Sequence, residues 1–173
     1  MIECAGCRRA TQLLFRPFRC WHTVLMTMIR PARPDDTDVL TQLIAVSFEP
    51  YIERIGARPG PMSTDCTSLI ASGSVWVADR DGDAVGTIAL TDEGDHLLLD
   101  NLAVSPSARG LGVGSQLLEF AADHAHSCGL GELRLHTNVA MTENLQYYPR
   151  RGFRETHRAT VDGFERVYFS RTL

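Results

Sequence analysis

The sequence contains no lysine, and all 17 of its basic residues are arginine. The chain therefore has no side-chain primary amine. A GC-rich genome is the simplest explanation of this bias. Since there are 21 acidic residues and the formal net charge is −4, we expect no basic surface of the kind that binds nucleic acids. No apolar run approaches the roughly 18 to 20 residues that a membrane span needs, so we expect no contact with a membrane.

Cysteine is scarce, and its pattern predicts neither disulfides nor a metal site. The five cysteines are odd in number and irregularly spaced, which is not the pattern of a disulfide framework. Such usage is typical of a reducing compartment, so we expect a cytoplasmic protein. Cys4 and Cys7, with Cys20 and His22 further on, approach a zinc-ligand spacing. No second C-x-x-C accompanies them, so we expect no bound metal.

Residues 1–27 differ in composition from the rest of the chain. They hold four arginines against one acid, and Arg16, Pro17 and Arg19 interrupt any apolar stretch that a signal peptide would need. We predict an N-terminal extension here, either from a start codon placed too early or as a poorly ordered arm. The length then predicts a single domain over residues 28–173.

The middle of the chain combines an apolar strand, a glycine-rich turn and an amphipathic helix. The strand ends at Val104, glycines follow at positions 110, 112 and 114, and the helix runs from about Gly112 to Cys128. The first turn of a helix has N–H groups without partners and carries the positive end of the helix dipole. Glycines allow an anion to approach the main chain closely. We therefore predict that residues 109–115 bind a phosphorylated ligand.

Two common phosphate-binding motifs do not fit this stretch. A P-loop requires Gly-Lys-Ser/Thr at its end, which the chain lacks. A dinucleotide-binding fingerprint reads G-x-G-x-x-G directly after the strand, whereas here the spacing is G-x-G-x-G and the turn from Val104 to Gly110 is too long. A flexible turn without a ligand is the structural alternative.

The segment Arg109-x-x-Gly112-x-Gly114 resembles the Q/R-x-x-G-x-G/A pattern of the GNAT superfamily of acyl-CoA N-acyltransferases, in which it follows a strand ending in L-A-V-x-P. The resemblance implies acetyl-CoA as the co-substrate. It also implies that the N–H of Val104 or of a close neighbour polarises the thioester carbonyl. The residues implied to bind acetyl-CoA are Leu102, Ala103, Val104, Arg109, Gly110, Leu111, Gly112, Val113, Gly114 and Ser115.

Hydrophobic periodicity and turn residues predict the order β-α-α-β-β-β-α-β-α-β-β, with the first strand at residues 28–32 and a final hairpin over 153–170. The resemblance covers nearly all of residues 28–173 and implies the α/β (α+β) GNAT fold. This is a central mixed, mostly antiparallel, splayed β-sheet of six to seven strands flanked by about four helices. The splay lies between the strand ending at Val104 and the strand at residues 133–137, where unpaired backbone groups could bond the pantetheine amides.

The phrase Tyr148-x-x-x-Gly152-Phe153 matches the Y-x-x-x-G-F phrase of the family. The resemblance implies that Tyr148 protonates the leaving thiolate, and a phenol has a suitable pKa near 10. Asn144 lies one helical turn before Tyr148 and is implied to contact the cofactor, although the commoner pattern has the asparagine where Met141 stands. Pro149 disfavours helical geometry at Tyr148, so Tyr147 stays open as an alternative acid.

The general base and the acceptor pocket are less well defined by sequence. Asp100 is our first choice of base, with Asp95, His96 and His136 as alternatives. The glycine- and proline-rich segment from residue 48 to 62 should be irregular. The resemblance places it at the acceptor pocket, so Phe48 and Tyr51 either contact the substrate or close the edge of the core.

The resemblance as a whole implies an N-acetyltransferase that passes an acetyl group from acetyl-CoA to a primary amine by direct attack in a ternary complex. An acyl-cysteine route is not favoured, because Cys128 lies at a helix end far from the strand split. The acceptor would be a small-molecule amine or a peptide N-terminus, and a homodimer is possible. The alternatives are transfer of a longer acyl group and a non-catalytic CoA-binding sensor.

Overall fold

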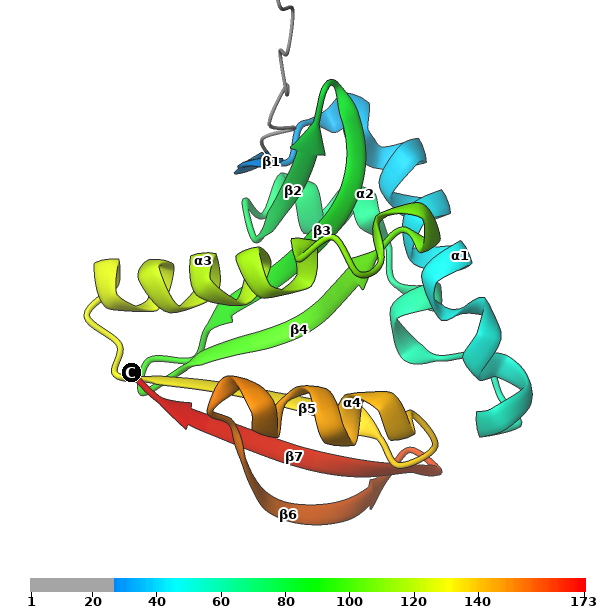
Figure 1. Ribbon diagram of the computed structural model, residues 1–173, viewed down its shortest axis with the longest axis vertical. Helices are drawn as coiled ribbons and strands as arrows, with labels where there is room; N and C mark the ends of the chain where they lie inside the picture. The colour runs from blue at the N-terminus through cyan, green and yellow to red at the C-terminus, as the bar shows by residue number, and fades with distance from the viewer. Residues whose placement is uncertain (1–26) are drawn as a thin grey trace, which may run out of the picture.

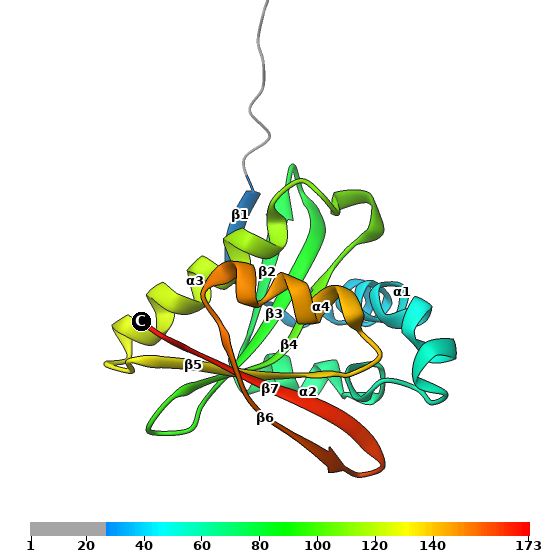
Figure 2. The same ribbon diagram turned by 60° about the horizontal axis from the view of Figure 1, so that its bottom comes forward.

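The predicted strands form one sheet in the computed structural model, which describes residues 27–173 (Figures 1 and 2). The expected N-terminal extension and the Cys4–Cys7 pair lie outside the described residues, except for Thr27, which opens β1. The strands are β1 (Thr27–Pro31), β2 (Val75–Arg80), β3 (Asp83–Asp92), β4 (Leu97–Val104), β5 (Glu132–Asn138), β6 (Arg154–Val161) and β7 (Phe164–Thr172). The helices are α1 (Thr37–Ile55), α2 (Cys66–Ala71), α3 (Val113–Ser127) and α4 (Thr142–Tyr147), with 3-10 turns at Pro34–Asp36, Gly60–Ser63, Pro106–Ala108 and Pro149–Arg151.

The seven strands follow the order β1-β2-β3-β4-β5-β7-β6. Every neighbouring pair is antiparallel except β4 and β5, which run parallel. Helices α3 and α4 cover one face of the sheet, and α1 and α2 pack on the other (Figure 2). The expected mixed, mostly antiparallel sheet with four helices is therefore confirmed.

Strands β4 and β5 pair only where Leu97–Leu99 lies beside Leu133–Leu135, and beyond that point they diverge (Figure 1). A β-bulge in β4 coincides with the divergence. Leu90 of β3 pairs with Leu99, but its neighbour Ala89 pairs with Asn101, so Asp100 is an extra residue. Because a bulge bends its strand and increases the local twist, it turns β4 away from β5 and opens the sheet.

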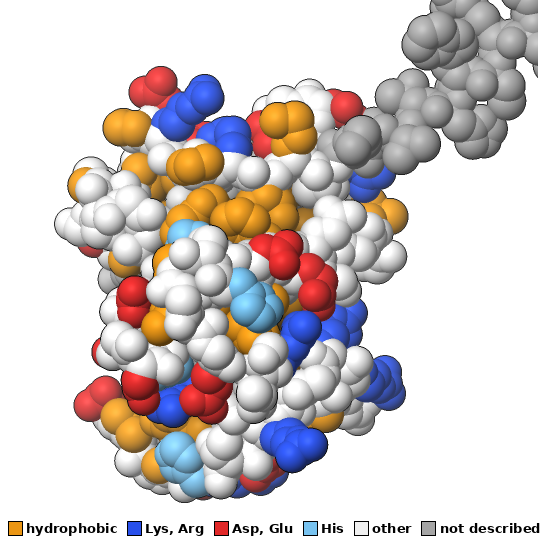
Figure 3. Space-filling model, turned by 90° about the vertical axis from the view of Figure 1, so that its left-hand side faces the viewer, with side chains coloured by type: hydrophobic (Ala, Val, Ile, Leu, Met, Phe, Trp, Pro, Cys, Tyr) orange, Lys and Arg blue, Asp and Glu red, His pale blue; other side chains and the backbone are white. Residues whose placement is uncertain are grey.

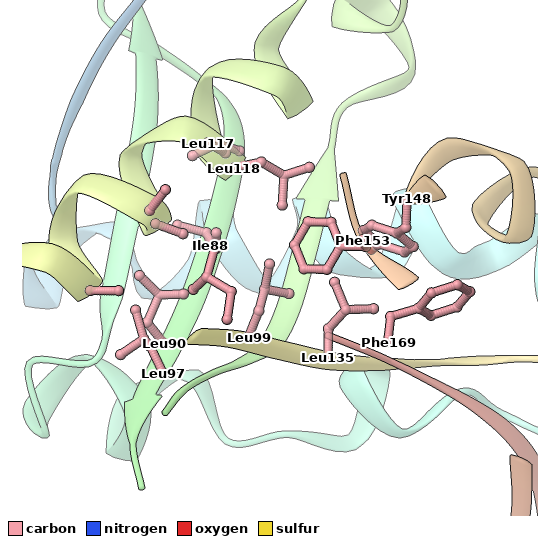
Figure 4. Close-up of a cluster of buried hydrophobic side chains, with 14 of the residues drawn as sticks. Ile88, Leu90, Leu97, Leu99, Leu117, Leu118, Leu135, Tyr148, Phe153 and Phe169 are labelled. Atoms are coloured by element: carbon pink, nitrogen blue, oxygen red, sulfur yellow. The ribbon is translucent and has the colours of Figure 1, made fainter. Parts of the chain in front are cut away.

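The largest buried cluster lies between the sheet and helices α3 and α4 (Figure 4). The predicted apolar face of α3 is buried in it and consists of Val113, Leu117, Leu118, Ala121, Ala122 and Ala125. Tyr148, Phe153 and Phe169 enter the same cluster from the C-terminal half of the chain. Burying each large apolar side chain contributes roughly 1.5 to 3 kcal/mol, so this cluster fixes the position of α4 and of Tyr148, which follows it.

The expectation of an irregular segment over residues 48–62 is wrong for its first half, because α1 continues through Pro50 to Ile55. Only the part from Gly56 onward lacks an α-helix or a strand. The buried stripe of Leu40, Leu43 and Ile44 packs α1 against the sheet. This packing offsets the helical hydrogen bond that Pro50 cannot donate. The helix ends at Gly56, whose φ of 74° is left-handed and whose N–H bonds to the Ile52 oxygen at 2.9 Å.

The molecular surface mixes charges of both signs. On the face where α3 ends, acidic and basic side chains are interspersed (Figure 3). No helix within residues 27–173 combines the length and the hydrophobicity that crossing a membrane would require.

Candidate active site

A cavity of about 1020 Å³ occupies the split between β4 and β5 and extends along α1, α3 and α4. It brings together nearly all the residues singled out from the sequence. Among the residues implied to bind acetyl-CoA, Leu111 is the exception, because it is 54% exposed and lies outside the cavity wall. The predicted residues that line the cavity are Phe48, Tyr51, Asp100, Leu102, Ala103, Val104, Arg109, Gly110, Gly112, Val113, Gly114, Ser115, Asn144 and Tyr148.

The glycine turn presents free main-chain amides to this cavity. Gly110 and Gly112 have φ values of 79° and 83°, a left-handed geometry that glycine adopts without strain. Within residues 27–173, the N–H groups of Gly110, Gly112, Val113 and Gly114 have no hydrogen-bond acceptor. These amides and the positive end of the α3 dipole therefore suit an anionic group such as a diphosphate.

The backbone of Val104 faces the split. The N–H of Ser105 bonds to the Val85 oxygen at 2.9 Å, and Val104 lies opposite Gly86 in the antiparallel ladder. Because hydrogen-bonding direction alternates along a strand, the N–H and C=O of Val104 point away from β3, toward the gap. The C=O accepts a hydrogen bond from Ser47 Oγ at 3.1 Å. The N–H has no partner among the described residues, because the pairing with β5 ends at Leu99, and it is available to a ligand.

Ser47 was not identified from the sequence, and it changes the interpretation of Arg109. The Ser47 side chain is buried on α1, and its backbone oxygen accepts a hydrogen bond from Arg109 Nη2 at 3.2 Å. Arg109 therefore ties α1 to the glycine turn while its guanidinium lines the cavity. The only sequence signal for Ser47 was its place on the apolar stripe of the first helix.

Arg151 is a second cation at the glycine turn that the sequence analysis missed. Its guanidinium donates to Ser115 Oγ at 2.7 and 3.2 Å and lies 3.6 Å from the centre of the Tyr147 ring. A Cβ on Gly114 would lie 2.6 Å from the Tyr147 hydroxyl, so Gly114 makes room for this ring. The i, i+4 spacing of Tyr147 and Arg151 was the available signal.

Tyr148 keeps helical geometry despite the proline that follows it. Its φ and ψ are −66° and −43°, and its N–H bonds to the Asn144 oxygen at 3.1 Å. The chain adapts by changing from α4 to the 3-10 turn at Pro149–Arg151. Tyr148 thus remains at the cavity wall. Tyr147 lines the cavity as well, with its hydroxyl close to Gly114 of the glycine turn.

The environment of Tyr148 favours its protonated form. The ring packs against Phe153 and Phe169 at centre distances of 5.7 and 5.8 Å, and only 7% of the residue is exposed. This burial raises the pKa of Tyr148 well above its usual value of 10. The hydroxyl, which bonds to none of the described residues, is therefore available as a proton donor.

Asn144 links α4 to β5. Its side-chain nitrogen donates to Thr137 Oγ1 at 3.0 Å and approaches Met141 Sδ at 3.5 Å. Its side-chain oxygen remains available to a ligand at the cavity wall.

The candidate bases now separate into two groups. Asp95 and His96 pair with each other at 2.5 Å in the β3–β4 turn, outside the cavity wall. Asp100, the bulge residue, lines the cavity and accepts a hydrogen bond from Thr91 Oγ1 at 2.5 Å. His136 of β5 also lines the cavity.

His136 is held in its neutral form. Burial lowers the pKa of His136, the nearby Arg166 lowers it further, and Asp100 partly opposes them. A neutral imidazole can accept a proton, so His136 is a candidate base at the cavity wall together with Asp100.

Residues 27–173 contain no group of three His, Cys, Asp or Glu side chains arranged to hold a metal ion. Cys66 is buried and Cys128 is exposed at the end of α3, and neither lines the cavity.

Comparisons with known proteins agree with this geometry. The profile of the family described as "Acetyltransferase (GNAT) domain" matches residues 71–155. The chain is 32% identical over 146 residues to the peptidyl-lysine N-acetyltransferase YjaB of Escherichia coli, covering 83% of this chain and 93% of that protein. It is 38% identical over 79 residues, 44% of this chain, to the IAA acetyltransferase of Azospirillum brasilense, of which it spans only about half, 52%.

The fold also matches a solved structure with coenzyme A. The PaiA N-acetyltransferase of Thermoplasma acidophilum in complex with coenzyme A superimposes with a TM-score of 0.74, covering 86% of this chain and 99% of that one at 18% identity. The resemblance first drawn from the Arg109–Gly114 pattern and the Tyr148 phrase is thus confirmed over most of the described residues. The chain belongs to the GNAT superfamily of N-acetyltransferases.

Proposed function

We propose that the protein transfers an acetyl group from acetyl-CoA to a primary amine by direct attack in a ternary complex. One observation carries the proposal. The free amides of Gly110, Gly112, Val113 and Gly114 adjoin the split toward which the N–H of Val104 points. An anion site continuous with an open strand edge is what an extended thioester ligand with a diphosphate requires.

The chain's own groups suit each part of this ligand. The free amides and the guanidinium groups of Arg109 and Arg151 would hold the diphosphate. The outward-facing backbone of Leu102 and Val104 would pair with the amides of the pantetheine arm. The bound co-substrate supplies the acyl group in activated form, as a thioester.

Two residues would move protons. Neutral His136, or Asp100 beside it, would accept the proton that the amine loses as its nitrogen forms the new bond to the carbonyl carbon. The N–H of Val104 would stabilise the negative charge that builds on the carbonyl oxygen. As the carbon–sulfur bond breaks, the Tyr148 hydroxyl would donate its proton to the sulfur.

The acceptor would enter beside α1. Phe48 and Tyr51 line this end of the cavity from α1, together with residues of the turn at 59–61. The acceptor is a small-molecule amine or the N-terminus of a peptide.

Calorimetry with coenzyme A and a thiol-release assay test this proposal together. We expect coenzyme A to bind, and thiol to appear when acetyl-CoA and a suitable amine are both present. No binding of coenzyme A would overturn the proposal. Binding without thiol release for any class of amine would identify a CoA sensor, and faster release from a longer acyl-CoA would replace acetyl as the group transferred.

A further inference from the structure

The acceptor end of the cavity contains an arginine that the reaction described above does not use. Arg166 lies on β7 opposite Asn138 of β5, and His136 lies opposite Tyr168. Arg166 and His136 are therefore diagonal neighbours on one face of the β5–β7 pair, where Cα atoms are about 7 to 8 Å apart. Both line the cavity.

Arg166 differs from the other two cavity arginines because its guanidinium makes no hydrogen bond to the described residues. Arg109 donates to the Ser47 oxygen and Arg151 donates to Ser115 Oγ. The Arg166 guanidinium donates no hydrogen bond to any residue from 27 to 173. Its nearest carboxylate, that of Asp162, is 3.6 Å away and 81% exposed, whereas the Arg166 side chain is only 25% exposed.

Each of the two acidic side chains that line the cavity has a partner among the described residues. Glu143 forms two short hydrogen bonds with Arg54, at 2.7 and 2.9 Å. Asp100 accepts a hydrogen bond from the Thr91 hydroxyl. The unused donors of Arg166 therefore favour an anionic ligand group at this end of the cavity.

Arg166 is also on the wrong element to serve the diphosphate. Its β7 neighbours Val167 and Phe169 point into the core beneath α4, so Arg166 projects from the opposite face of β7. The diphosphate site at the start of α3 already has Arg109 and Arg151. Phe164, two residues before Arg166 on the same face, adds an apolar surface to the cavity wall.

We propose that the acceptor is a short amine that carries an acid group, either a carboxylate or a phosphonate, and that Arg166 binds this acid group while the amine lies beside His136. A planar guanidinium with free donors binds either acid in a two-point contact. The diagonal spacing of Arg166 and His136 suits an amine and an acid a few bonds apart. This inference rests on the proposed acetyl transfer.

Matched amine pairs in the thiol-release assay provide the test. β-Alanine is compared with β-alaninamide, and 2-aminoethylphosphonate with ethanolamine, at saturating acetyl-CoA. We expect the acid-bearing member of a pair to have at least a 10-fold higher kcat/KM, with most of the difference in KM. The pair with the larger ratio shows whether carboxylate or phosphonate is preferred.

Variants assign the preference to Arg166. In Arg166→Met the ratio should fall to near 1 while the Kd for coenzyme A stays unchanged, and Arg166→Lys should retain part of the ratio. Arg158→Gln is the matched control, because Arg158 pairs with Glu155 on β6 away from the cavity wall, and it should keep the full ratio.

The outcomes separate the two proposals. Equal turnover of acid-bearing and neutral amines, or a ratio that survives in Arg166→Met, would overturn the role of Arg166 and leave acetyl transfer intact. Absence of thiol release with every amine would overturn both.

Discussion

Tyr148 illustrates how one side chain serves both packing and chemistry. Its ring belongs to the largest buried cluster (Figure 4). The residue also lines the cavity, and its hydroxyl has no partner among the described residues. Burial disfavours the phenolate and keeps the proton on the oxygen, so the hydroxyl can donate to a sulfur on which negative charge builds.

Replacing Tyr148 with Phe should lower kcat by about 10² to 10⁴, the usual contribution of a general acid. The unfolding transition and the Kd for coenzyme A should change little, because the Phe ring fills the same space. Thiol-release kinetics measure the first effect, and thermal unfolding and calorimetry the others. Tyr147→Phe is the matched variant, and a larger loss of kcat there would move the acid role to Tyr147.

His136 predicts a pH dependence of stability. The ordinary pKa of histidine is 6.5. In the folded protein, burial and the charge of Arg166 lower the pKa of His136, and the charge of Asp100 offsets part of this decrease. The unfolded chain therefore binds this proton more readily. The free energy of unfolding should fall as the pH drops from 6.5 toward the folded-state pKa.

Urea unfolding between pH 5 and pH 8 checks this expectation. His136→Asn should show a shallower loss of stability toward low pH than the wild type. His126→Asn, which changes an exposed histidine on α3, should keep the wild-type slope. Identical slopes for all three proteins would show that His136 titrates normally.

At the scale of elements, the junction of β4 and α3 depends on two glycines for different reasons. Gly112 needs its left-handed backbone, with a φ of 83°, and a Cβ there would meet nothing within 4 Å. Gly114 has no such backbone requirement, but a Cβ there would collide with the Tyr147 hydroxyl. One glycine is needed for the conformation of the turn and the other for the approach of α4.

The two alanine variants should therefore fail differently. Gly112→Ala should lose about 1 to 2 kcal/mol of unfolding free energy through the left-handed backbone. Gly114→Ala should lose less stability, but it should weaken coenzyme A binding several-fold because Tyr147 and Arg151 must shift. Chemical denaturation and calorimetry on both variants make the comparison, and equal effects would contradict it.

At the scale of the molecule, the sheet consists of two halves that meet over a short parallel contact. Only three residue pairs join β4 to β5, and the Arg54–Glu143 pair bridges α1 and α4 across the cavity. A ligand in the split would contact both halves and should stabilise the whole domain.

Coenzyme A at 100 times its Kd should raise the unfolding free energy by about 2.7 kcal/mol. For a chain of this size that corresponds to an increase in Tm of about 5 to 11 °C. Scanning calorimetry with and without the ligand measures it. Pantetheine, which lacks the diphosphate, should give a much smaller increase at the same concentration, and equal increases would argue against the glycine turn as the main anchor.

The sequence by itself determined the order of the elements, the apolar face of α3 and the glycine turn at its start. These features are local, since helical periodicity, strand alternation and glycine at left-handed positions are each visible within a few residues. The family pattern at Arg109–Gly114 follows from the same local requirement for free amides.

Only the tertiary structure decided which side chains meet. Ser47 contacts Val104 and Arg109 across 57 and 62 residues, and Arg166 lies beside His136 because of the register between β5 and β7. The extension of α1 through Pro50 and the bulge at Asp100 also depend on packing against distant strands. Contacts of this kind are set by strand register and by the way helices seat on the sheet, and no pattern within a short stretch of sequence encodes them.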